Sequence, residues 1–529
     1  MAIEALSGWT KEQKSVVAAA YLGWMLDAFD FFLLVFVLRD IAAEFKTGIP
    51  AVALALVLTL AMRPIGAFIC GRIADRFGRR PTLAAVVLMY SGLAFASGFS
   101  TNLTMLLILR ALFGIAMGGE WGVGASLAME TIPPKARGLV SGILQAGYPS
   151  GYLIASVVYG LLYQYIGWRG MFMIGIAPAA LVYFILRNVE ESPSWTPKPA
   201  LGVDSLATLS GYGRLVLYAI LVFIAFQYGA QAGTFASASN GLAAMGAFLS
   251  LPLISSLCLI AALASSVWLA LRYPDHWIEF FAVLGMIFVD FFTFAVPEIP
   301  LLMAVIYNTA AVLAGVFLKT HWRIGLYSVL LMTAFNFFSH GTQDLYPTFL
   351  QVQQHFSSAT VSTLAVVYNI GAILGSLFFG SLSERIGRRR AILISTLLSI
   401  PIIPLWVFAG SPLWFAAGSF LMQFMVQSAW GIIPVHLNEL SPPEMRGTFP
   451  GFVYQLGNLL ASVNATLQSG YAVAHGNDYG TALALIAGGS AIAIVLLVAF
   501  GAERKGVHLG TEGGEPQSEG VALTPQQAE

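Results

Sequence analysis

The sequence predicts an all-α polytopic membrane protein, built from two related six-helix halves with an inserted block between them. Of its 529 residues, 58% are hydrophobic and only 10% are charged, whereas an average soluble domain has about 25% charged residues. Several motifs recur along the chain at one constant spacing, and basic residues collect in alternate connecting segments. These observations favour many helices that cross a lipid bilayer.

The first half, 1–190, contains six apolar stretches, each near the length of about 20 residues that a membrane span needs. The first stretch is too long for the apolar core of a cleavable signal, which has about 7–15 residues. It also carries Asp27 and Asp30, which a signal core would exclude. The expected spans are 15–38, 51–71, 82–100, 103–124, 139–163 and 170–187.

The second half, 324–505, contains six more stretches, and the inserted segment 191–323 contains four. The weakest of the four is 214–231, because the residues after it are neither clearly helical nor clearly a loop. We expect 16 spans, or 14 if two inserted segments are re-entrant, and a disordered tail over 506–529. The expected spans are 214–231, 247–271, 277–296, 299–318, 324–348, 360–380, 390–410, 413–435, 448–470 and 480–501.

An internal repeat relates the two halves. Gly71 to Arg80 recurs as Gly380 to Arg389, an offset of 380 − 71 = 309 residues. The segment from Glu130 to Gly138 recurs at the same offset, and so does the dipeptide Trp121-Gly122. A shared offset for three motifs predicts two halves of parallel topology.

Charge distribution predicts the orientation of the chain. Twenty-one Lys and Arg residues fall in the segments on the side of the N-terminus, against Arg39, Lys46 and Arg169 on the other side. The positive-inside rule therefore predicts cytoplasmic N- and C-termini in a multi-pass protein of the inner (plasma) membrane. The 26 basic and 26 acidic residues balance, which argues against nucleic acid as a partner.

Reactive-site signatures are missing from the sequence. Cys70 and Cys258 lie in apolar stretches without Cys-x-x-Cys spacing, so we expect inert thiols and neither a disulfide nor a metal site. No nucleophile–base pair, metal spacing or phosphate loop supports an enzyme or a cofactor. We expect a monomer in the lipid bilayer.

Polar residues cluster unexpectedly in one apolar stretch near the middle of the chain. Such groups at membrane depth normally face a bundle interior or a wet cavity, where they handle a substrate or an ion. Three of them, Asn336, His340 and Gln343, share one helical face. The alternative is a polar packing seam, which we prefer for Ser339 and Thr342 taken alone. The cluster comprises Asn336, Ser339, His340, Thr342, Gln343, Asp344 and Thr348.

Two acidic residues in the first span form a second candidate. Asp27 and Asp30 are three residues apart and so are neighbours on one helical face. Two close carboxylates in a low dielectric do not both ionise easily. A pair of this kind suits proton coupling, and an interfacial, solvated pair is the alternative.

The repeated loops share the pattern Gly-x-x-x-[Asp/Glu]-Arg-x-Gly-Arg-Arg, which resembles the cytoplasmic loop motif of the major facilitator superfamily. Its glycines permit a tight turn, its arginines anchor the loop, and its acid can bridge to a neighbouring helix end. A topology anchor and a gating role are both consistent with this. The gating-loop residues are Gly71, Asp75, Arg76, Gly78 and Arg79, with Glu384, Arg385, Gly387 and Arg388 in the repeat.

Within that superfamily, two motifs, Gly23 to Phe32 and Gly118 to Gly122, resemble the sialate:proton symporter family. The polar cluster 336–348 is similar to the Asn-x-x-[Ser/Thr]-His-x-[Ser/Thr]-Gln-Asp-x-x-x-Thr motif of the fungal lactate/pyruvate permeases of that family. This resemblance covers about 1–190 and 324–505 and implies a major facilitator fold that carries short monocarboxylates with protons. The insert departs from the fungal permeases and is more like bacterial sialate carriers.

Two arginines lie well inside predicted spans. Each costs about 2.5–3.5 kcal/mol at mid-helix unless paired or hydrated, so Arg63 and Arg110 are candidate partners of anions. Arg63 is the first choice for a substrate. Arg110 resembles the superfamily's fourth-helix Arg-x-x-x-Gly pattern, which implies a role in proton transfer together with Glu120. Structural pairs, Arg110–Glu120 or Arg63–Asp27, are the alternative.

The residues together predict a secondary transporter for a small organic acid anion and protons. Substrate binding is assigned to Arg63 and the polar cluster, and proton coupling to Asp27, Asp30, Arg110, Glu120 and Asp344. A sialic acid:proton symporter is one alternative. A membrane sensor without flux is another. Asp290 in the insert is either a second ion site or, as we prefer, a structural hydrogen-bonding group.

Overall fold

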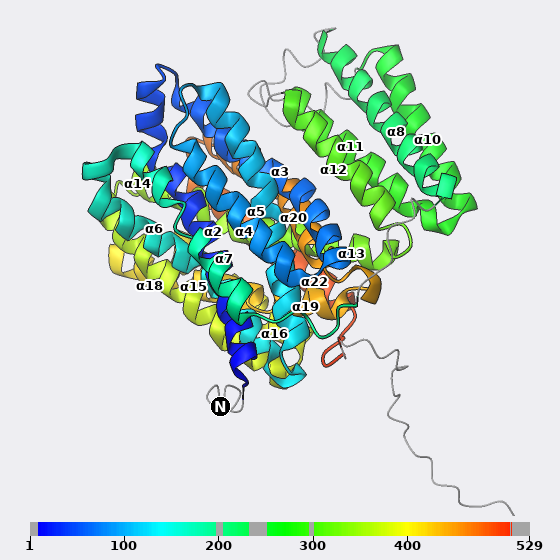
Figure 1. Ribbon diagram of the computed structural model, residues 1–529. Coiled ribbons are helices and arrows are strands. Elements are labelled where there is room, and N and C mark those ends of the chain that lie inside the picture. The colour runs from blue at the N-terminus through cyan, green and yellow to red at the C-terminus, as the bar shows by residue number, and fades with distance from the viewer. Residues whose placement is uncertain (1–8, 197–204, 232–250, 296–300, 508, 510–529) are drawn as a thin grey trace, which may run out of the picture.

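The computed structural model describes residues 9–196, 205–231, 251–295, 301–507 and 509. Within these ranges the secondary structure is entirely helical (Figure 1). Each predicted span overlaps a helix. Ten helical segments of the described chain are long and apolar enough to cross a membrane. The fold class is thus α-helical and polytopic, while the total of 16 spans stays a prediction.

The first half consists of six helices in chain order. A change to φ = 59° at Gly167 interrupts α6 and divides it into two helical pieces. The elements are α2 (Lys11–Glu44), α3 (Ile49–Phe77), α4 (Arg79–Ser97), α5 (Leu103–Thr131), α6 (Arg137–Ile174) and α7 (Ala179–Asn188).

The second half repeats this order with more interruptions. Short breaks divide four of its six predicted spans into two helical pieces each. The main elements are α13 (Trp322–Gln343), α14 (Tyr346–Val352), α15 (Ser358–Ile386), α16 (Arg388–Ser399), α17 (Ile403–Val407), α18 (Pro412–Trp430), α19 (Ile433–Leu440), α20 (Phe449–Ala461), α21 (Asn464–Ala474) and α22 (Tyr479–Phe500).

Four helices lie between the halves in sequence and stand beside the main bundle in Figure 1: α8 (Ser205–Gln231), α10 (Leu253–Arg272), α11 (Trp277–Ala295) and α12 (Leu301–Phe317). The weakest predicted span, 214–231, lies within α8, and the residues 232–240 that follow it lie outside the described residues. Asn308 donates to both carboxylate oxygens of buried Asp290, at 3.0 and 3.1 Å. Asp290 therefore joins α11 to α12, as the structural interpretation expected.

The inserted helices pack against both halves through α12. The Phe317 ring lies 5.5 Å from Phe68 of α3 and 5.6 Å from Phe452 of α20, measured between ring centroids. Tyr307 of α12 also shares a 2.7 Å hydrogen bond with Ser462 beyond α20. Helix α12 therefore covers the seam between α3 and α20.

The two loop motifs form the same turn in each half. Gly78 (φ = 105°) separates α3 from α4, and Gly387 (φ = 96°) separates α15 from α16. Residues with a side chain rarely adopt these φ values, so glycine lets each pair of helices reverse in a single residue. We call the side of the molecule that carries both turns the loop face.

Glycines on α5 allow a close approach to α3. A Cβ atom on Gly118 would lie 2.1 Å from the Arg63 carbonyl oxygen, and one on Gly114 would lie 2.3 Å from that of Thr59. Backbone contacts this close leave no room for a side chain. Arg63 is consequently held on a helix that cannot move away from α5 without losing these contacts.

The two halves also meet through glycines, on the side toward the loop face. A Cβ atom on Gly122 of α5 would lie 2.7 Å from the Cα of Gly451 of α20. On the other side of the bundle, a Cβ atom on Gly142 of α6 would lie 2.3 Å from the Ser376 carbonyl oxygen of α15. The halves are in direct backbone contact at two symmetric places.

Candidate functional site

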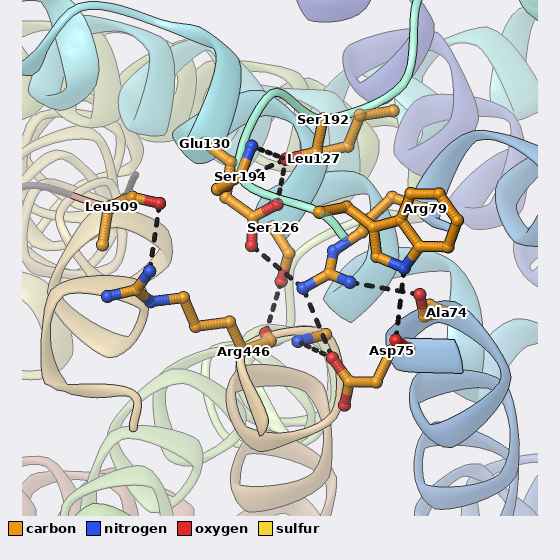
Figure 2. A network of polar contacts seen from close by, with 12 residues as sticks. Ala74, Asp75, Arg79, Ser126, Leu127, Glu130, Ser192, Ser194, Arg446 and Leu509 are labelled. Carbon is orange, nitrogen blue, oxygen red and sulfur yellow. Dashed lines mark hydrogen bonds and ion pairs between the residues drawn. The ribbon is translucent and has the colours of Figure 1, made fainter. Parts of the chain in front are cut away.

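A buried ionic network joins the halves on the loop face (Figure 2). Asp75, near the end of α3, accepts hydrogen bonds from the Gly447 backbone N–H (2.8 Å) and the Thr448 hydroxyl (2.5 Å). Both donors belong to the segment that starts α20. Arg79 holds Asp75 at 3.3 Å and Glu130 at 3.1 Å. The acid of the first motif therefore bridges to the opposite half.

The second motif makes the equivalent contact in the other direction. Glu384, near the end of α15, accepts a hydrogen bond from the Gly138 backbone N–H at the start of α6. Arg388 holds Glu384 at 2.9 Å and Glu439 at 3.0 Å. Negative charge is favourable at helix N-termini, and both acids lie at one. The loop face is closed in this conformation.

The arginine that directly follows the acidic residue of each motif points away from the network. Arg76 lies over the ring of its neighbour Phe77 at 5.0 Å. The Arg385 side chain is exposed. Their positions fit a role as charged anchors of the loop more closely than a role in holding the halves together.

The segments that follow the last helix of each half fold back onto the same network. Glu191 accepts hydrogen bonds from the Arg79 (2.9 Å) and Arg80 (3.1 Å) backbone N–H groups at the start of α4. Glu503 does the same for Arg389 (3.0 Å) at the start of α16. A carboxylate thus satisfies the free amides at each helix N-terminus.

The described residues at the beginning of the predicted tail also contact both halves. Arg137 of the first half donates to the Val507 carbonyl at 2.8 Å. Arg446 of the second half donates to the Leu509 carbonyl at 3.0 Å, which Figure 2 shows, and the Leu509 side chain is buried. The predicted disorder from residue 510 onward falls outside the described residues.

Three carboxylates lie deep in the first half. Asp27 and Asp30 of α2 and Glu120 of α5 are at most 1% exposed. None of their oxygen atoms has a hydrogen-bond partner in the described part of the chain. A buried, unpaired carboxylate is very unfavourable in its charged form, so the interfacial, solvated interpretation of the Asp27–Asp30 pair is wrong.

The two membrane arginines face these acids. Arg63 donates to the Met117 sulfur at 2.6 Å and interacts electrostatically with Asp27. Arg110 donates to the Ser97 hydroxyl at 2.7 Å and interacts with Asp30. Neither structural pair considered from sequence is hydrogen-bonded, because the Asp27 and Glu120 oxygens have no hydrogen-bond partner in the described residues. Arg110 faces Asp30 instead of Glu120.

The second half contributes a histidine–aspartate pair at the end of α13. His340 Nδ1 lies 3.2 Å from Asp344 Oδ1, and their side chains are 33% and 40% exposed. His340 also interacts electrostatically with Arg63 of the first half. Charged groups from both halves therefore face one shared region, where two of them stay accessible.

Two other members of the polar cluster, Thr342 and Gln343, join α13 to α18. Gln343 donates to Gln423 Oε1 of α18 at 2.9 Å, and Gln423 in turn donates to the Thr342 hydroxyl at 3.1 Å. Asn336 donates to the Met332 carbonyl of its own helix at 2.8 Å. The packing interpretation preferred for Thr342 agrees with this geometry.

Ser339 and Thr348 are half-buried at the edge of the same region. The Ser339 hydroxyl accepts a 3.4 Å hydrogen bond from Gln343. Thr348 lies in α14, beyond the break that Pro347 introduces. The cluster thus divides into a helix-packing part around Gln423 and an accessible part around His340.

Sequence reasoning missed the tyrosines around Arg63. Tyr148 of α6 and Tyr454 of α20 both interact electrostatically with Arg63, and Tyr148 also interacts with Asp344. Tyr454 packs against Trp121 with ring centroids 4.6 Å apart. Aromatic residues are common in membrane helices, so only proximity to Arg63 distinguishes these two.

The described residues contain no group of three or more His, Cys, Asp or Glu side chains that could hold a metal ion. Cys70 and Cys258 are free thiols, of which Cys70 is buried and Cys258 is partly exposed. The arrangement therefore contains two sets of ionic contacts between the halves, three buried acids, two buried arginines and a half-exposed histidine.

These features define the class of the protein. Two pseudo-symmetric helical halves, closed against each other on one face around a central ionic region, are those of a membrane transporter. The Major Facilitator Superfamily model matches residues 20–340 and 326–525. The chain belongs to this superfamily, and its classification as a transporter and not an enzyme follows from that membership.

Two relatives of this chain are transporters by name, which agrees with its membership of the superfamily. The sialic acid transporter NanX of Escherichia coli K12 is 23% identical over 508 residues, covering 93% of this chain and 96% of NanX. A carboxylic acid transporter protein homolog of Saccharomyces cerevisiae is 24% identical and covers 85% of this chain and 60% of its own length.

Solved structures support the same fold. The proton:xylose symporter XylE aligns with a TM-score of 0.59 at 15% identity, over 94% of this chain and 97% of that chain. The human organic anion transporter MFSD10 aligns with a TM-score of 0.58 at 14% identity, over 92% and 99%. At these identities the likeness concerns the fold alone.

Proposed function

We propose that the protein is a secondary transporter that carries a small carboxylate together with protons across the inner membrane. The observation that carries this proposal is the half-exposed His340–Asp344 pair of the second half, whose Nδ1 and Oδ1 atoms are 3.2 Å apart, together with the membrane-embedded guanidinium of Arg63 in the first half. A carboxylate can bridge a guanidinium and a protonated imidazole by charge-assisted hydrogen bonds. Relatives named as carboxylic acid and sialic acid transporters support the same chemistry.

Proton coupling is assigned to the buried acids of the first half. Within the described residues, Asp27 and Asp30 have no hydrogen-bond partners, so compensation of their charge depends on Arg63 and Arg110. When an anionic substrate engages Arg63, Asp27 loses part of that compensation. Proton uptake by Asp27 then removes the uncompensated charge. Substrate and proton therefore favour each other's binding.

Alternating access would open and close the ionic contacts of the loop face. Asp75 and Glu384 each close this face by bridging to a helix start in the opposite half. The positive-inside bias supports a cytoplasmic loop face with both termini on that side, so the present conformation would face outward. We assign the transport units to 1–190 and 324–505, the inserted segment to 191–323 and the tail to 506–529, and we expect a monomer.

The substrate favoured from the residues is a lactate- or pyruvate-like monocarboxylate. The complete match around His340 to the permease motif supports this choice. NanX, which is similar over 93% of the chain, supports sialic acid as the alternative. A sensor without flux is less well supported, because the chain keeps both gates and the central ionic region.

Uptake into proteoliposomes tests the proposal. Lactate, pyruvate and sialic acid would each be offered in the presence of an inward pH gradient and a lumenal pH dye. We expect one of them to enter with acidification of the lumen. Uptake that continues unchanged after the pH gradient is collapsed would refute proton coupling. Binding of a substrate without any uptake would favour the sensor.

A further inference from the structure

A small cavity next to Glu120 is not accounted for by the central ionic region. Its volume is ≈ 10 Å³, and Trp24, Glu120 and the apolar residues Ala20, Gly124 and Leu144 line it. A single water needs about 10–15 Å³ measured in this way. Ala20 lies about two helical turns nearer the loop face than Asp27 on α2. The cavity therefore lies beside Glu120, between Asp27 and the loop face.

Its walls carry a donor and an acceptor that both lack partners. The Trp24 indole Nε1–H and both Glu120 carboxylate oxygens are buried without a hydrogen bond in the described chain. The indole can only donate, and an ionised carboxylate can only accept. Unsatisfied buried polar groups beside a cavity of water size are normally joined by an ordered water.

The backbone holds the Glu120 carboxylate at the cavity. A Cβ atom on Gly23 of α2 would lie 2.3 Å from Glu120 Oε1, so only glycine leaves space for this oxygen. The Glu120 carboxylate therefore packs directly against the backbone of α2. Its exposure is 0%, which leaves the cavity as the place where a proton can be exchanged.

We propose that this cavity binds one water molecule, which accepts a hydrogen bond from Trp24 and links Glu120 to the proton pathway. The inference rests on the proposed function and deepens it. When Glu120 gives up its proton, its O–H bond breaks and a new O–H bond forms on this water. The water releases another of its protons to bulk water once the loop face opens, so it is regenerated.

Trp24 has a second contact that connects this water to the substrate region. Its ring packs against Tyr148 with centroids 5.4 Å apart, and Tyr148 interacts with Arg63. A substrate bound at Arg63 would change the electrostatic environment of Tyr148. Because Trp24 packs against Tyr148, the position of Trp24 would respond in turn. Trp24 is therefore a positioning residue between the anion and the proton.

The surroundings of Glu120 contain few other titratable groups. Asp27 of α2 and Tyr90 of α4 interact with it electrostatically. From α3, Cys70 packs against the neighbouring Gly119, and α6 contributes the apolar Leu144. Asp27 is thus the acid whose protonation is coupled most directly to that of Glu120.

Filling the cavity provides the sharpest test. In Gly124→Ala the new Cβ would lie 3.5 Å from Glu120 Oε1 and 3.7 Å from Ala20 Cβ, which are ordinary contacts. The variant should fold and exclude the water. We expect uptake driven by a pH gradient to fall about tenfold, while substrate exchange at equal pH stays normal. Gly92→Ala on α4 is the matched control, since nothing lies within 4 Å of its new Cβ.

Trp24→Phe tests the donor and keeps an aromatic ring beside Tyr148. It should slow driven uptake and spare exchange, as Gly124→Ala does. Trp430→Phe is its control, because Trp430 also has a buried indole N–H without a partner, in the other half. The proposal would be overturned if Gly124→Ala and Trp24→Phe left driven uptake unchanged. It would also be overturned if the control variants lowered driven uptake equally. Wild-type uptake without pH dependence would instead refute the proposed function.

Discussion

At the scale of single residues, the central ionic region combines groups that neither half could supply alone. Arg63 lies on α3, and His340 lies on α13 of the other half, yet their charges interact. The Arg63 side chain is only 2% exposed. Its Nε–H has no hydrogen-bond partner in the described residues, so it keeps a donor with which to bind an anion.

Arg63→Lys should reduce substrate transport at least about tenfold, because lysine keeps the charge but loses the planar fork that binds a carboxylate. His340→Ala should abolish uptake while leaving expression intact. Both are measured as uptake by proteoliposomes with equal protein content. Arg323→Ala, an exposed arginine at the start of α13, is the control. Normal flux in either site variant would mean that the binding region was misassigned.

At the scale of helices, close packing and capping decide where functional side chains lie. Gly118→Ala would place a Cβ atom 2.1 Å from the Arg63 carbonyl. We expect a loss of about 1–3 kcal/mol of stability from overpacking, together with reduced transport. Thermal unfolding in detergent and uptake measure these effects. Gly489→Ala on α22, with nothing within 4 Å of its Cβ, should change neither.

The cap of α22 allows a prediction that is independent of transport. Asp478 accepts hydrogen bonds from the Thr481 backbone N–H at 3.0 Å and from Gln353 at 3.2 Å. The bonds from Thr481, followed by the contribution of Gln353, lower the pKa of Asp478. The stabilisation is therefore present above the unfolded-state pKa of about 3.9 and lost as pH falls through the lower, folded value.

Asp478→Ala should cost about 1 kcal/mol of stability at neutral pH, as expected for loss of an N-cap. Asp478→Asn keeps an accepting oxygen and should cost much less. Thermal unfolding at pH 7 compares the two variants. Equal destabilisation by both, or none by alanine, would show that the cap contributes little to the stability of this helix.

At the scale of the whole molecule, the loop-face network sets the balance between conformations. Asp75→Asn removes the charge from hydrogen bonds to Gly447 and Thr448. Loss of charge assistance should weaken closure by about 1.5–3 kcal/mol, which raises the open population by about tenfold or more. Labelling of a cysteine placed at buried Ala67, in a variant without the two native cysteines, would report this opening.

Arg76→Gln is the matched control for the gate, because Arg76 belongs to the same motif but lies over Phe77. Its labelling rate should equal that of the parent protein. A parent-like rate in Asp75→Asn would mean that the glycine contacts between the halves, such as Gly122 with Gly451, keep the face closed without the ionic network.

Several of these features could be predicted from the sequence because they depend on short-range patterns. Apolar length places each helix, the 309-residue offset indicates two halves, and each loop glycine marks a turn that needs a positive φ. The polar cluster around His340 was also visible, since polar groups stand out against an apolar run. Its division into a packing part and an accessible part was not, because Gln423 lies about 80 residues away.

The sequence by itself determined that this is a helical membrane protein of two repeated halves, because hydropathy and repetition are properties of the chain read in order. Only the tertiary structure decided which charges meet. Arg110 faces Asp30 because helix packing in three dimensions turns Glu120 toward Gly23 and Trp24. The contacts of Arg63 with His340, Tyr148 and Tyr454 likewise require both halves to be folded together.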